Sequence, residues 1–99
     1  MNKDITTCMG YQQIFGPSVS TALTIPKVDP VTGLAAMPTH AIMICELQGV
    51  RWRDDGVAPT AAIGMPLSVG TVFVYDGDLT RFRFIQQAAN ATINVAYYK

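Results

Sequence analysis

Apolar and polar residues alternate along most of this 99-residue chain, and six prolines and eight glycines divide the alternation into short segments. A period of two places every second side chain on the same side of an extended backbone, whereas a helix repeats its apolar residues every three to four positions. The prolines and glycines leave no uninterrupted stretch for a long amphipathic helix. The sequence therefore predicts an all-β protein with at most one helical turn, near Leu79.

We expect six or seven strands, each bounded by turn residues. Residues 40–47 are apolar on both faces, which is typical of a central strand covered on both sides. Residues 58–69 contain Pro59, Gly64 and Pro66 and predict either a long loop or short edge segments, because proline cannot donate a hydrogen bond to a neighbouring strand. The other expected strands alternate clearly and span residues 19–25, 50–54, 71–76, 81–86 and 91–98.

A chain of this length builds one hydrophobic core and buries about two thirds of its unfolded surface. Short strands at near-regular spacing are typical of a small antiparallel β-sandwich or barrel, jelly-roll-like in architecture, because two inward-facing sheets hide every apolar face. We expect residues 19–99 to form this single domain. Residues 1–18 show no sustained alternation and predict an extended N-terminal arm that docks elsewhere, with Tyr11 and Phe15 as candidate contact residues.

Charged residues make up only 14 % of the chain, and seven basic residues balance seven acidic ones. A chain without net positive charge lacks the electrostatic attraction that holds most nucleic-acid-binding and basic membrane-surface proteins, so we expect neither partner. Low charge also removes the repulsion that keeps small proteins apart. Composition therefore favours a protein that packs against other protein subunits.

Few residues suit catalysis or metal binding. His40 is the only histidine, and no acidic residue in its neighbourhood marks it as the base of a nucleophilic pair. Cys8 and Cys45 lack the spacing of a zinc or redox site and are expected to be free thiols, with Cys45 buried. The glycines are scattered and form no phosphate-binding loop. We therefore predict no enzyme activity, no catalytic residue, no metal and no cofactor.

Two pairs of arginines lie on the outward faces of two expected strands, with short aspartate clusters in the turns nearby. One interpretation is a solvated sheet face, on which the arginines pair with the aspartates and add little to stability. The other is a protein interface, because arginine is enriched at binding hot spots and forms paired hydrogen bonds with carboxylates. Both interpretations stay open. The candidate interface residues in this domain are Arg51, Arg53, Asp54, Asp55, Arg81, Arg83 and Tyr98.

Two parts of the sequence resemble small structural proteins of tailed bacteriophages. The first is VRWRDDG at residues 50–56, followed by Pro59-Thr60 and by GMPL at 64–67; the second is LTRFRFI at 79–85 with ATINVAYY at 91–98. The resemblance extends roughly over residues 40–98. It implies a virion protein with a compact β-fold, namely a capsid decoration or cement protein that stabilises the assembled head shell, and it implies no enzyme activity.

This resemblance also implies partners and a location. The partners are the major capsid protein and further copies of this chain, with a trimer as the favoured homo-oligomer. The protein would be made in the host cytoplasm, since its start lacks the apolar core of a signal peptide, and would reside on the capsid surface. The alternative is a carbohydrate-binding module of a head fibre or the tail, for which Trp52 and Tyr98 are the candidate sugar platforms.

Overall fold

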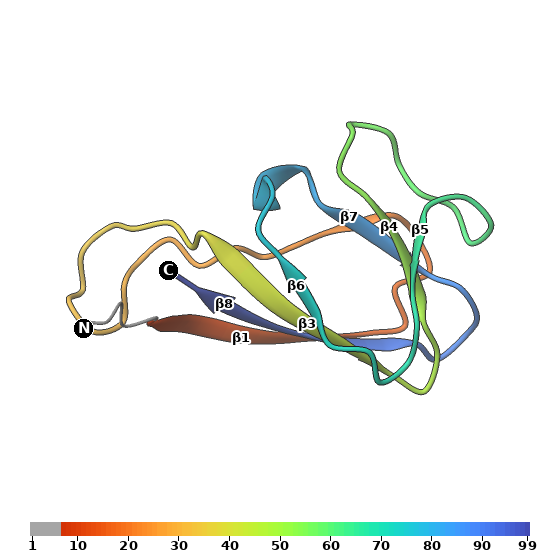
Figure 1. Cartoon of the computed structure of the whole chain (residues 1–99), viewed down its shortest axis with the longest axis horizontal. Coiled ribbons are helices and arrows are strands. Elements are labelled where there is room, and N and C mark those ends of the chain that lie inside the picture. The colour runs from red at the N-terminus through yellow and green to blue at the C-terminus, as the bar shows by residue number, and fades with distance from the viewer. Residues whose placement is uncertain (1–6) are drawn as a thin grey trace.

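The computed structural model describes residues 7–99, which form two four-stranded antiparallel sheets packed together (Figure 1). In sheet A the strand order is β1-β8-β3-β6, and in sheet B it is β2-β7-β4-β5. Sheet A consists of β1 (Cys8–Phe15), β3 (His40–Glu46), β6 (Phe73–Tyr75) and β8 (Thr92–Tyr98). Sheet B consists of β2 (Thr21–Ala22), β4 (Val50–Arg53), β5 (Met65–Leu67) and β7 (Arg83–Gln86). The one helical element described is η1 (Leu79–Arg81), a 3-10 turn.

The strands pair as a single folded antiparallel ribbon: β1 with β8, β2 with β7, β3 with β6 and β4 with β5. Two further pairings, β3 with β8 and β4 with β7, join the ribbon into two sheets. Most connections therefore cross from one sheet to the other, which is the arrangement of an eight-stranded jelly roll. The predicted all-β sandwich is confirmed, with eight strands in place of six or seven.

The core lies between the sheets and uses the alternation that the sequence predicted. Tyr97 and its alternate neighbours in β8 are buried, as are Phe82 and Phe84 around the start of β7. The Tyr97 hydroxyl donates a hydrogen bond of 2.7 Å to Gln12 Oε1, so this buried polar group has a partner. The largest fully buried side chains are Tyr97, Phe82, Phe84, Met43, Ile93, Val50, Val95 and Cys45.

The predicted arm is wrong for residues 8–15, because they form β1 at the edge of sheet A. This strand pairs with β8 as far as Phe15, and its Met9 side chain is buried in the core. The sequence shows no apolar alternation here because two inward positions hold Gly10 and Gln12. These residues lie opposite Tyr97 and Val95 of β8. Gln12 serves the buried Tyr97 hydroxyl there, in a position where an apolar residue is the usual expectation. Residues 1–6 of the expected arm lie outside the described residues.

Several element boundaries also differ from expectation. The strand expected over 19–25 shortens to β2, and part of the segment 81–86 is taken by η1, which confirms the helical turn near Leu79. The Asp78 side chain caps this turn by accepting a hydrogen bond of 3.0 Å from the Thr80 amide. The segment 58–69 combines both options, since a loop leads into the short edge strand β5 with Pro66 at its centre.

Candidate functional site

The outer face of sheet A is predominantly apolar. Because alternate residues of β3 and β8 are buried in the core, the remaining ones point outward, and the register aligns Tyr11, Ala96, Ile42 and Val74 in one row across all four strands. Among the strand residues on this face, Glu46 is the only charged one. We call this surface the A face and define it by its apolar members: Tyr11, Phe15, Ile42, Ile44, Val74, Ala96 and Tyr98.

Two aromatic residues of β1 dominate the exposed part of the A face. Tyr11 and Phe15 expose 64 % and 66 % of their surface, although both belong to a regular strand. Exposed aromatic side chains on a sheet face are unusual because their burial is favourable, and contiguous apolar surface of this kind marks interaction sites. The sequence named both residues as contact candidates, but on an arm and not on a sheet.

Polar groups between these apolar residues bond to one another. The Tyr11 hydroxyl and Gln13 Nε2 both donate hydrogen bonds to Asn94 Oδ1, and Asn94 Nδ2 donates one of 2.7 Å to Glu46 Oε2. At the other end of the face, the rings of Tyr98 and His40 stack with centroids 5.6 Å apart. These contacts hold the side chains in place before any partner arrives, which lowers the entropic cost of binding.

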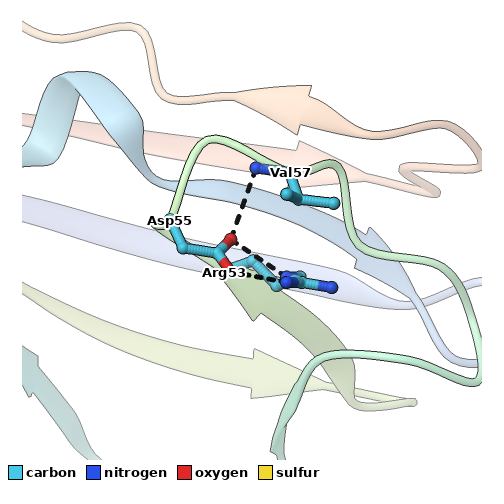
Figure 2. Close-up of polar contacts among 3 residues, drawn as sticks. All are labelled: Arg53, Asp55 and Val57. Carbon is cyan, nitrogen blue, oxygen red and sulfur yellow. Dashed lines mark hydrogen bonds and ion pairs between the residues drawn. The ribbon is translucent and has the colours of Figure 1, made fainter.

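The outer face of sheet B carries arginines. Arg53 of β4 lies directly opposite Arg83 of β7, so two like charges are neighbours across the sheet. Asp55 offsets this repulsion by accepting two hydrogen bonds from the Arg53 guanidinium, 3.0 Å and 2.5 Å long, and a third from the Val57 amide (Figure 2). The guanidinium lowers the pKa of Asp55 to about 2 and has its own pKa raised in return.

Arg51 fastens the loop that joins β4 to β5. Its Nε atom donates to the Ala61 carbonyl at 3.1 Å, and its Nη1 atom donates to the Gly64 carbonyl at 2.8 Å. In Figure 1 this loop extends beyond the two sheets, at the end opposite the C-terminus. Arg51 was predicted as an interface residue, and the structure assigns its hydrogen bonds to the loop backbone.

Asp54 and Asp78 are also engaged locally. Asp54 Oδ2 accepts a hydrogen bond of 2.6 Å from the buried Tyr75 hydroxyl, and burial together with this carboxylate raises the pKa of Tyr75. Asp78 accepts from the amide and hydroxyl of Thr80, and those bonds lower the pKa of Asp78. Of the expected arginine–aspartate pairs, Arg53–Asp55 is the one that forms an ion pair within residues 7–99.

Two hollows open beside the arginines and Trp52 of sheet B. The first, of about 340 Å³, is lined by Arg81 and Arg83 together with Ser20, Thr80 and residues 56–58. The second, of about 460 Å³, lies beside Trp52 and the loop before β5. The sequence around Ser20 and residues 56–58 does not predict that they line a site. They lie beside the two arginines only because the fold brings these segments together.

Trp52 is only partly exposed and packs within an aromatic cluster. Its ring centroid lies 5.3 Å from that of Phe73, 5.7 Å from that of Tyr75 and 5.1 Å from that of Phe82. Since these rings cover much of the indole, Trp52 packs against the core and is not a freely exposed sugar platform.

The predicted interface residues therefore fall into two groups on opposite sheets. Tyr11, Phe15 and Tyr98 belong to the A face, whereas the arginines and aspartates lie on or near sheet B. The two cysteines are free: Cys8 is exposed, while burial of Cys45 raises the pKa of its thiol to about 11. Within the described part of the chain, no three His, Cys, Asp or Glu side chains gather in a way that suits a metal ion.

None of the helical structure described in residues 7–99 has the length and apolar character needed to cross a membrane. Comparison of the chain with models of protein families, with curated proteins and with solved structures found no match.

Proposed function

We propose that this protein is a structural protein of a tailed-bacteriophage virion, a decoration protein that binds the assembled head shell. The observation that supports this most strongly is the A face, on which one row of apolar residues crosses all four strands of sheet A, Tyr11, Phe15 and Val74 are exposed, and Glu46 is the one charged strand residue described. Aromatic residues are the commonest anchors of protein interfaces, and charged residues are depleted at interface centres.

The A face extends over four strands, which suits a partner with a broad surface. In the proposal, the A face lies against coat subunits and covers Tyr11 and Phe15. A protein that binds only the assembled lattice stabilises it by linkage, by about 2.7 kcal/mol when its free concentration is one hundred times its Kd. Several small contacts across a coat–coat boundary would thus oppose rupture of the shell without any chemical step.

The jelly-roll fold agrees with this proposal but does not carry it. Jelly rolls occur in viral capsid domains and also in lectins, so the fold favours both functions that the sequence brought forward. The resemblance of residues 40–98 to small phage structural proteins adds weight to the first. We further propose a homo-oligomer, with a trimer favoured, which native mass spectrometry of the purified protein tests directly.

The decisive experiment is the copy number of this protein in purified particles of the phage that encodes it, measured by quantitative mass spectrometry against the major coat protein. We expect a number close to that of the coat subunit. A few copies per particle would move the protein to the tail or a fibre. Absence from the particle would contradict a virion function altogether.

The second candidate is a carbohydrate-binding module, favoured by the hollow that Trp52 and Met65 line beside Asp54 and Asp55. Sugars are commonly held by an aromatic ring and neighbouring carboxylates. However, three rings pack around Trp52, and both aspartates already accept hydrogen bonds from within the chain. Tryptophan fluorescence distinguishes the two functions, because quenching on addition of glycans would support the sugar-binding module.

A further inference from the structure

A hollow on the outer side of sheet B brings together two guanidinium groups and two hydroxyl-bearing residues. It lies between η1, β7 and residues 56–58, has a volume of about 340 Å³, and is lined by Arg81, Arg83, Ser20 and Thr80. This volume lies at the lower end of the range of ligand pockets and is large enough for one acidic side chain. The Thr80 hydroxyl already donates to Asp78, so the donors left to the hollow are the two guanidinium groups and the Ser20 hydroxyl, which suit an anionic acceptor.

The two arginines of this hollow form no ion pair with any carboxylate of residues 7–99. The nearby carboxylates bond elsewhere: Asp55 to Arg53, Asp54 to Tyr75, and Asp78 to Thr80. Arg53 lies directly across the sheet from Arg83, and its charge is balanced by the ion pair with Asp55. Asp78 is the carboxylate nearest to this lining: it bonds to Thr80, and the charge of Arg81 helps to lower its pKa, but neither arginine of the hollow forms an ion pair with it.

The backbone at Gly56 is shaped to accept the Arg81 side chain. Gly56 has a φ of +86°, and a Cβ atom added there would lie only 2.7 Å from Arg81 Nη2. The next turn of the chain is fixed by the hydrogen bond from the Val57 amide to Asp55. Arg81 thus rests against a defined segment of backbone, and this limits the conformational freedom that it would lose on binding.

We propose that this hollow is a carboxylate-binding site that accepts an aspartate or glutamate side chain of a protein partner. Arginine binds carboxylates through two parallel hydrogen bonds, and such charge-assisted bonds are stronger than neutral ones. An extended nucleic acid is a poor match, because the chain has no net positive charge to hold a run of phosphates. That the partner is a virion subunit rests on the proposed function. The binding of a carboxylate by this hollow does not depend on that function.

The test is an NMR titration of the full chain that follows the side-chain Nε–Hε signals of the arginines. The probe is a blocked seven-residue peptide with two central glutamates among alanines, and its matched control carries glutamines. We expect saturable shifts at Arg81 and Arg83 with a Kd on the order of 1 mM for the glutamate peptide only. Equal responses to both peptides, or no saturation, would overturn the proposal.

Variants locate the binding. Arg81→Gln and Arg83→Gln should each weaken binding of the glutamate peptide at least tenfold, whereas Lys27→Gln, an equal change of charge at an exposed position outside the hollow, should alter it less than twofold. Inorganic phosphate serves as a third ligand. Phosphate binding tenfold tighter than the peptide would identify a phosphate site and contradict the proposed acidic side chain.

This outcome is separate from that of the particle analysis. Carboxylate binding in solution by a protein that is absent from virions would leave the site intact and remove the proposed function. Conversely, the protein could be abundant in virions while its Arg81 and Arg83 signals do not shift with the glutamate peptide. That result would support the proposed function and contradict the carboxylate site.

Discussion

The two outer faces of the sandwich are built by the same alternation yet have opposite surface chemistry. On the A face, Tyr11, Phe15 and Val74 point to the exterior, and the polar groups between them bond to one another. On the outer face of sheet B, Arg51 and Arg53 point outward, and each has hydrogen-bond partners within the chain. Charged residues are ordinary on the solvent-exposed face of a sheet. The apolar A face is therefore the surface that indicates a binding partner.

The energies favour the A face as the driving surface. Tyr11 and Phe15 each expose about two thirds of their area. That fraction of an aromatic side chain is roughly 100–160 Å², and covering it would contribute at most about 2.5–4 kcal/mol for each residue. Exposed ion pairs contribute far less, because water and salt screen them. In this comparison the A face supplies affinity and the arginine hollow supplies selectivity.

The largest effect is expected from truncating the A face. Replacing Tyr11 and Phe15 together by alanine should weaken binding to particles at least a hundredfold, because it removes the two aromatic anchors. Binding is measured by co-sedimentation with particles that lack the protein. Truncating Val28 and Val31, which are exposed in the loop before β3, is the matched control and should change affinity less than twofold. Unchanged binding by the aromatic variant would refute the role of the A face.

A glycine pair tests the arginine hollow. Gly56→Ala and Gly33→Ala both force alanine into a positive φ, so each should lower the free energy of unfolding by about 1–2 kcal/mol. Nothing lies within 4 Å of a Cβ at position 33, whereas one at position 56 displaces the end of Arg81. Urea denaturation should therefore barely separate the two variants, while carboxylate binding should be lost with Gly56→Ala alone. Equal binding by both would argue against the site.

Arg51 and Arg83 should differ although both are outward arginines. Arg51→Ala removes two hydrogen bonds to the loop backbone and should cost about 1 kcal/mol. It should also speed amide exchange in residues 58–64. Arg83→Ala, which removes no hydrogen bond within the described chain, should stay within about 0.5 kcal/mol of the parent protein. A reversed order would show that Arg51 does not secure the loop.

The smallest effect concerns acid. The pKa of Asp55 is lowered to about 2 in the folded protein, against an unfolded value near 3.9. The stabilisation by its ion pair with Arg53 is therefore complete above about pH 4 and is lost as the pH falls through about 2. A carboxyl NMR titration should place the pKa of Asp55 well below the ordinary value of an aspartate. A midpoint near 3.9 would mean that the pair seen in Figure 2 does not persist in solution.

Sequence patterns predicted the local structure well wherever inward positions were apolar. The alternation around Phe82 and Phe84 identified a core strand, and the turn at Leu79 was expected before it was observed. Sequence patterns did not predict β1, because Gln12 points inward there. Its side chain accepts a hydrogen bond from the hydroxyl of Tyr97, near the opposite end of the chain. A polar residue that is buried because of a distant partner leaves no periodic signal.

By itself, the sequence determined the all-β character, the turns and the buried cysteine at Cys45, because spacing between near neighbours decides which side chains share one side of a strand. Only the tertiary structure decided the jelly-roll order and placed Tyr11 beside Ala96, or Gly56 against Arg81. The physical reason is that strand register depends on pairings between distant segments, and local alternation is compatible with many of them.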